Sequence, residues 1–199
     1  MLVDSHCHLN YEGLSDQIPA VLTRAEDAGV SHMVCICSRL SEFGEVSAVA
    51  EAHERVYCSV GIHPHDVESE PETDVGSLVD LANHPKTIGI GETGLDFHYS
   101  KSTQKHQTFS LIKHIEVAKE HNLPVIIHAR DADTKIKEIL TNEYKKGPFN
   151  CVMHCFSSSS YLADAMIELG FYLSMSGIIT FNKSNPFIIG ITISSNITS

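Results

Sequence analysis

The sequence predicts an α/β fold, a TIM-like (β/α)8 barrel of parallel strands with helices outside. Short β-branched runs alternate with stretches of helical period, which indicates repeated βα units. Runs such as "PVIIHA" are apolar without alternation, as in a parallel sheet buried on both faces. No glycine-rich dinucleotide fingerprint follows the first run, so the main argument for an open doubly wound sheet is missing. The seven runs are 2–6, 32–37, 56–62, 87–91, 124–128, 150–155 and 171–176.

Three of the intervening segments carry clear helical signals. The first places apolar residues on one stripe after Ser15 and stops at Gly29, a good C-terminal signal. The segment "YLADAMIELG" likewise ends at a glycine, Gly170. In the long segment "STQKHQTFSLIKHIEVAKEHN", the expected apolar stripe is Phe109, Ile112, Ile115 and Ala118. The histidines on or near that segment are expected to face solvent or neighbouring side chains: His98, His106, His114 and His121.

The composition is that of one globular domain spanning residues 1–199. Apolar residues make up 42% of the chain and charged residues 20%, both ordinary for a soluble protein. No window is long and apolar enough to span a bilayer, and the N-terminus lacks the features of a signal peptide. We therefore expect a cytoplasmic protein with no membrane association. Reduced, buried thiols are expected inside the apolar runs, at Cys35, Cys37, Cys58 and Cys151.

The formal net charge is −11, with 14 Lys and Arg against 25 Asp and Glu. This balance argues against a broad cationic face that grips duplex DNA by its phosphates. An anionic substrate remains compatible with the chain if bound metal ions supply positive charge locally.

Histidine and glutamate side chains recur where the predicted strands end. In "VDSHCHLN", His6 and His8 are two residues apart on an extended segment, so they point to one face while Cys7 points to the other. Each such residue taken alone is well explained as a hydrogen-bonded strand terminus. Such residues recur at the ends of successive predicted strands. This recurrence favours one shared site, because the carboxyl ends of barrel strands converge on one rim. The remaining strand-end residues are His63, His65, Glu92, His128 and His154.

A cluster of imidazoles with a carboxylate suits a pair of divalent ions roughly 3.5–4 Å apart, an arrangement that can bind and split a phosphoester. Imidazole-rich ligation favours Zn, Mn, Co or Ni over Ca.

The chain resembles the TatD family of metal-dependent hydrolases. The matching strings are "VDSHCH", "SVGIHPH", "IGIGETGLDF", "PVIIHARDAD", "VMHCFS" and "GFYLSMSGIITF", which occur in family order over residues 1–181. This resemblance implies a distorted (β/α)8 barrel with a binuclear centre of two divalent ions (Mg, Mn, Zn or Co).

The resemblance also implies roles for individual residues. His6 and His8 would hold one ion, His128 and His154 the other, and Glu92 would bridge them. His63 would line the site as a catalytic residue beside Glu92, orienting water or phosphate. The expected contacts to a substrate phosphate are His65 and Arg130.

Three functions are compatible with such a site. The leading one is a phosphodiesterase of the 3′→5′ exodeoxyribonuclease type that acts on DNA ends. The second keeps the site and changes the bond, as in an ester or amide hydrolase such as an aminoacyl-tRNA deacylase. The third is an inactive, truncated gene product. The expected partners are DNA ends or tRNA as substrates, with no obligate protein partner.

The resemblance stops near residue 181. The family continues with a helix and an eighth strand that ends in a metal-ligating aspartate, whereas 182–199 reads "NKSNPFIIGITISSNITS". No acidic residue follows Glu168. We therefore expect an incomplete barrel of seven recognisable strands, without the final helix and eighth strand, followed by an atypical tail over 182–199. Such a chain is expected to keep up to five metal ligands with weak or no nuclease activity.

Overall fold

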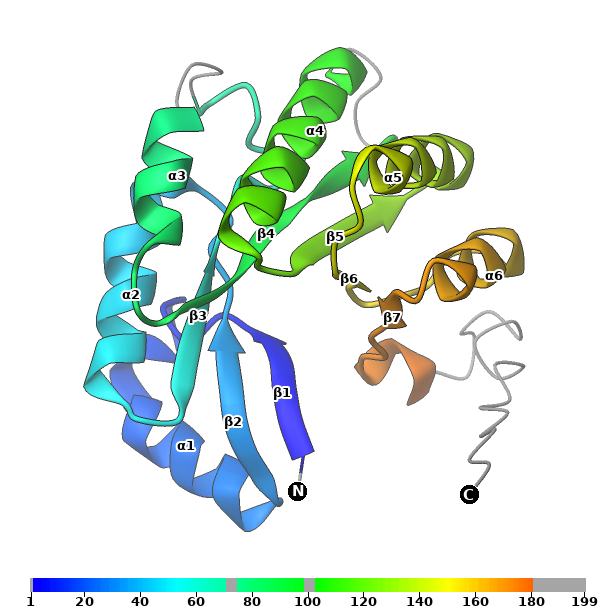
Figure 1. Ribbon diagram of the computed structural model, residues 1–199. Coiled ribbons are helices and arrows are strands. Elements are labelled where there is room, and N and C mark those ends of the chain that lie inside the picture. Colours follow the sequence, from blue (N-terminus) through cyan, green and yellow to red (C-terminus); the bar gives the residue numbers. More distant parts are fainter. Residues whose placement is uncertain (1, 71–74, 99–102, 181–199) are drawn as a thin grey trace.

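The computed structural model describes residues 2–70, 75–98 and 103–180. Its strands form one parallel sheet in which strands adjacent in sequence are also adjacent in space, so β1 and β7 are its edges in the described part of the chain. The sheet curls, with helices on its outer side (Figure 1). The strands are β1 (Leu2–Cys7), β2 (Val30–Cys35), β3 (Val56–Val60), β4 (Thr87–Asp96), β5 (Val125–Arg130), β6 (Cys151–Met153) and β7 (Tyr172–Leu173).

Six α-helices connect these strands within the described residues, which confirms the predicted α/β barrel fold over seven strands. Short 3-10 turns stand at Ser15–Gln17, Leu40–Glu42 and Gly177–Thr180. The predicted tail, 182–199, and hence any eighth strand or final helix, lies outside the described residues. The helices are α1 (Ile18–Asp27), α2 (Phe43–Ala52), α3 (Val75–Ala82), α4 (Gln104–His121), α5 (Asp133–Lys146) and α6 (Ser160–Glu168).

Local signals set the ends of these helices. α1 has a proline in its first turn, where the missing N–H costs nothing, and the chain leaves it through Gly29, whose φ of +85° suits a residue without a side chain. The Ser159 side chain accepts a hydrogen bond from the Leu162 backbone N–H and so caps the start of α6.

The core lies mainly between the sheet and the helices. The larger apolar cluster joins helix residues such as Leu111 and Ile136 to strand residues such as Val125. A smaller cluster on the other face of the sheet consists of Val34, Ile36 and Ile126, with Val152 packed against it. Burial on both faces explains why the strands read as continuous apolar runs.

The buried face of α4 differs from the predicted stripe. Phe109, the first residue of that stripe, is 45% exposed, so the stripe and the buried face do not coincide. α4 packs mainly on β4 and turns a different row of residues inward. That row is Gln107, Leu111, His114, Ile115, Val117 and Ala118.

His114 is buried in this face rather than turned to solvent. The backbone N–H of Ile62 donates to its Nε2 over 3.0 Å, so its Nδ1 carries the proton and donates to the Ser110 carbonyl at 2.7 Å. Burial lowers the pKa of His114 to about 4, so the imidazole is neutral at neutral pH.

The predicted thiols are confirmed as free and buried at Cys35, Cys37, Cys58 and Cys151. Cys7 packs against the helix-side cluster and its Sγ donates to the Val34 carbonyl at 3.3 Å, so it faces away from its histidine neighbours as predicted. Within the described residues, no helix combines the length and the apolar character needed to cross a membrane.

Candidate metal centre

Glu92 is the centre of the strand-end cluster. Its side chain is buried on β4, and its backbone N–H donates to the Cys37 carbonyl at 3.1 Å. Imidazole nitrogens from four other strand ends surround its carboxylate. The distances to Glu92 are 3.2 Å for His6 Nε2, 3.2 Å for His128 Nδ1, 3.7 Å for His63 Nε2 and 3.7 Å for His154 Nε2.

Glycines let the strands approach closely enough to form this cluster. A Cβ on Gly61 would lie 2.5 Å from the Cα of Gly91, so the chain after β3 and the strand β4 pack backbone against backbone. Gly91 also has a φ of +141°, which L side chains rarely adopt. These two positions bring His63 and Glu92 together.

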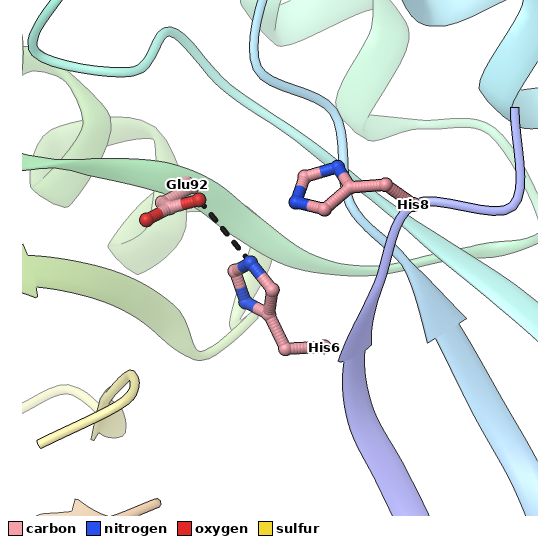
Figure 2. A group of neighbouring side chains, drawn as sticks. All are labelled: His6, His8 and Glu92. Carbon is pink, nitrogen blue, oxygen red and sulfur yellow. Dashed lines mark ion pairs between the residues drawn. The ribbon is translucent and has the colours of Figure 1, made fainter. Parts of the chain in front are cut away.

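Two groups of side chains could each hold a metal ion. Within each group the potential ligand atoms lie within 4.8 Å of one another, and Glu92 belongs to both. Figure 2 shows the first group, with His6 and His8 from the end of β1 directed toward Glu92 on β4. The groups are His6, His8 and Glu92, and His63, Glu92 and His128.

His154 belongs to neither group within the described residues, although its Nε2 lies 3.7 Å from Glu92. Its ring stacks on that of His6 with a centroid distance of 3.3 Å. The geometry thus brings His6 and His8 together with Glu92, and it places His63, rather than His154, in the group with His128. The ligand role of His154 stays a prediction.

Unpaired nitrogens show that the cluster fits a metal. The Nδ1 atoms of His6, His8 and His154 are buried and have no hydrogen-bond partner in the part of the chain that the structure describes. Buried polar atoms without partners are rare in folded proteins and commonly mark a bound ion or water. Imidazole nitrogens around a carboxylate are typical donors for a transition metal.

The charge states of most of these groups also suit a cation. His128 is the exception, because burial disfavours its charged ring but hydrogen bonds with Glu92 and Asp96 outweigh burial and raise its pKa. Burial lowers the pKa of His63 and of His154 to about 4, and it lowers the pKa of His8 as well. Burial opposes the ionisation of Glu92, but hydrogen bonds from His128 and His6 outweigh it and hold the pKa of that carboxyl far below its usual range. Neutral imidazoles and an ionised carboxylate are the forms that bind metal.

Asp96 contacts the cluster, although the sequence patterns did not single it out. It ends β4, is 1% exposed, and its Oδ2 lies 2.7 Å from His65 Nε2 and 3.1 Å from His128 Nε2. A signal was present in "GETGLD", because residues four apart on a strand share a face, which pairs Asp96 with Glu92.

The two expected phosphate contacts lie at the edge of the cluster. The side chain of His65 is 41% exposed and is held by Asp96. Arg130 is exposed at the end of β5 and lines a polar cavity of about 660 Å³. They are near the rim of the candidate metal centre, and neither belongs to the two metal-ligand groups found among the described residues.

Comparisons with known proteins show which family the chain belongs to. The family model described as TatD related DNase matches residues 3–190. The chain belongs to the TatD-related DNase family. Its relatives in this family include the metal-dependent hydrolases YcfH of Escherichia coli and YabD of Bacillus subtilis. YcfH is 37% identical over 186 residues, which is 92% of this chain and 69% of that protein. YabD is 34% identical over 184 residues, which is 92% of this chain and 72% of that protein.

Solved structures of the family have the same fold. The crystal structure of YjjV, a TatD homologue from Escherichia coli, superposes with a TM-score of 0.86 at 28% identity, covering 93% of this chain and 71% of that one. A TatD family hydrolase from Entamoeba histolytica superposes with a TM-score of 0.75 at 22% identity, covering 87% of this chain and 64% of that one. The chain is thus a member of a metal-dependent hydrolase family, and its strand ends carry side chains able to bind metal.

Proposed function

We propose that the TatD-type chain hydrolyses phosphodiester bonds at DNA ends, as a 3′→5′ exodeoxyribonuclease with two divalent ions. The observation that carries this proposal is the position of Glu92, which is shared by two groups of metal-ligand side chains. A carboxylate shared by two such groups could serve two ions, and paired ions are typical of centres that split phosphoesters. The family's description, TatD related DNase, supports nucleic acid as the substrate.

In this proposal His6, His8 and Glu92 would hold one ion, while Glu92, His128 and His154 would hold the other. His63 is the catalytic residue that orients water or phosphate, and its place beside Glu92 and His128 also makes it a candidate ligand. When bound, the divalent ions (Mg, Mn, Zn or Co) supply a Lewis acid for activating water and for neutralising phosphate charge.

The chain's own residues orient the substrate. His65 and Arg130 stand at the rim, where an imidazole and a guanidinium can bind phosphate oxygens. The Asp96 carboxylate forms hydrogen bonds with Nε2 of both His65 and His128. One carboxylate therefore positions the proposed phosphate contact, His65, and the proposed metal ligand, His128.

The experiment compares three substrates on the purified 199-residue chain. The protein is stripped with a chelator, reloaded with one divalent ion at a time, and given 5′-labelled single-stranded DNA, aminoacyl-tRNA and a simple aryl ester. We expect stepwise shortening of the DNA from its 3′ end. Glu92→Gln should abolish it, whereas His32→Ala, a histidine on β2 outside both ligand groups, should leave it unchanged.

The other outcomes separate the alternatives. Turnover of aminoacyl-tRNA or ester without turnover of DNA would favour the deacylase-type hydrolase. Metal binding without turnover of any of these substrates would favour an inactive chain. Trimming that proceeds equally in Glu92→Gln would contradict the proposed centre.

A further inference from the structure

We propose that a groove beside the candidate metal centre binds the single strand of DNA behind the cleaved end. It consists of an inner polar cavity and an outer aromatic cavity that share Phe97 and Lys135, and we call it the strand groove. This inference rests on the proposed function and names the form of DNA that the site accepts.

The inner cavity opens at the same rim as the metal centre. Its volume is about 660 Å³, and its lining residues directly follow site residues along the chain. Phe97 follows Asp96, and Arg130 stands two residues after His128. The backbone N–H of Phe97 donates to the Arg130 carbonyl at 2.9 Å, which holds the ends of β4 and β5 together. The serines 157–159, just after His154, complete the lining.

The chemistry of the inner cavity suits a phosphate. Arg130 supplies a guanidinium, and Ser157 and Ser158 line the cavity beside it, whereas the hydroxyl and the backbone N–H of Ser159 both donate to Asp133. Two carboxylates also line it, but both have protein partners. Asp131 Oδ2 pairs with His98 Nδ1 at 2.8 Å, and Asp133 accepts from the backbone N–H of Ser159 at 3.0 Å.

The outer cavity continues the groove between α4 and α5, which contact each other beside the ends of β4 and β5 (Figure 1). Its volume is about 500 Å³, and no carboxylate is among its described lining residues. It has an apolar floor of Phe97, Phe109 and Ile112, with Lys105 and Lys135 beside it. Lys135 also forms a solvent-exposed ion pair with Glu138 at 3.0 Å.

Phe109 is a large apolar residue that is not buried in the core. Its ring is 45% exposed on the outward side of α4, although the sequence places it at a helical spacing typical of a core position. The Lys113 ammonium lies 5.7 Å from the ring centroid, and it also pairs with Glu116 at 2.7 Å.

This alternation of cationic and aromatic groups fits single-stranded rather than duplex DNA. Proteins that bind single strands combine basic grooves for the backbone with aromatic rings on which bases stack. In a duplex the base faces are stacked and inaccessible to aromatic side chains. A protein that binds a duplex by its phosphates also needs a broad basic surface, which a net charge of −11 does not favour. A phosphate at Arg130 and a base on Phe109 are therefore the expected contacts.

The test compares a substrate that enters the groove with one that does not. The long probe is fluorescein-labelled oligothymidine, and the short one is a p-nitrophenyl diester of thymidine phosphate that ends at the metal centre. Fluorescence anisotropy on the metal-loaded chain gives the binding constant, and initial rates give kcat/KM. The variants are Phe109→Ala, Phe109→Leu and the double variant Lys105→Ala with Lys135→Ala.

We expect Phe109→Ala to weaken oligothymidine binding about 5- to 150-fold, the range for loss of one stacked base. Phe109→Leu, which keeps apolar volume without the aromatic face, should weaken it too. The double lysine variant should lower the slope of log K against log salt by about 0.7 for each lost phosphate contact. All variants should keep wild-type kcat/KM on the short diester. The controls are Ile167→Ala, an exposed apolar residue of α6, and Lys145→Ala at the other end of α5, both outside the groove.

The outcomes distinguish the groove from the proposed function. If the short diester is hydrolysed and the groove variants bind oligothymidine as the wild type does, DNA binding in the strand groove is refuted and the proposed phosphodiesterase function is supported. If no diester is hydrolysed but Phe109→Ala and Phe109→Leu weaken oligothymidine binding, DNA binding in the strand groove is supported and the proposed phosphodiesterase function is refuted. Tighter binding of a duplex than of the single strand, or no oligothymidine binding by the wild type, also overturns the groove.

Discussion

The Oδ2 atom of Asp96 lies 3.1 Å from Nε2 of His128, and the other nitrogen of that ring, Nδ1, lies 3.2 Å from Glu92. His128 is therefore held between two carboxylates of the same strand, β4. Outer partners of this kind fix the ring orientation of a metal-binding histidine and raise its basicity. The same Asp96 oxygen lies 2.7 Å from His65 Nε2, so one buried group positions a proposed metal ligand and a proposed substrate contact.

Asp96→Asn should weaken metal binding without removing a ligand. The substitution keeps the side-chain size and loses the charge that orients His128, so we expect about a 10- to 100-fold loss of affinity for one ion. Competition with a chelating dye measures this affinity. Asp164→Asn on the exposed face of α6 is the control and should bind metal as the wild type does. Wild-type affinity in Asp96→Asn would show that Asp96 has no such role.

Glu92→Gln should reduce the metal content of the protein more than His65→Ala does. Glu92 belongs to both ligand groups, whereas His65 belongs to neither of these groups of described residues. We expect Glu92→Gln to lose both ions and His65→Ala to retain them, as measured by elemental analysis after gel filtration. Equal metal content in the two variants would instead favour Glu92 as a structural carboxylate at a strand end.

Combined substitution of His6 and His8 by alanine should remove one ion and spare the other. The two imidazoles share one face of the chain at the end of β1 and form a single group with Glu92. Single substitutions His63→Ala and His154→Ala then show which histidine completes the second position, because only loss of a ligand lowers the stoichiometry. Unchanged metal content in the double variant would refute the assignment of His6 and His8.

His114 should make the fold less stable as the pH falls. Its pKa is about 4 in the folded chain against an ordinary value of 6.5, because burial disfavours the charged ring. The unfolded chain therefore binds more protons between these values, so stability is complete above about pH 6.5 and declines by about 3 kcal/mol toward pH 4.

Urea unfolding of the metal-free chain between pH 4 and pH 7.5 measures this dependence. In His114→Gln the amide oxygen can still accept from Ile62 N–H, so the variant should fold and show a flatter pH dependence. A dependence as steep as that of the wild type would assign the acid sensitivity to other groups.

The sequence by itself determined the order of strands and helices and the location of the candidate site. Apolar runs and helical periods are local properties, and the carboxyl ends of parallel strands must meet on one rim, so the sequence suffices to place Glu92 and the strand-end histidines together. It also suffices to place Cys7 on the helix side, since alternate residues of a strand face opposite ways.

Only the tertiary structure decided which of these side chains contact each other. The curl of the sheet sets the distances between strand ends, and it groups His63 with Glu92 and His128 while His154 stacks on His6. It also decided that Asp96 supports His128 and His65, and that α4 turns Phe109 outward. A periodic pattern states that a helix has an apolar face, but the neighbours that pack on the helix decide which residues that face contains.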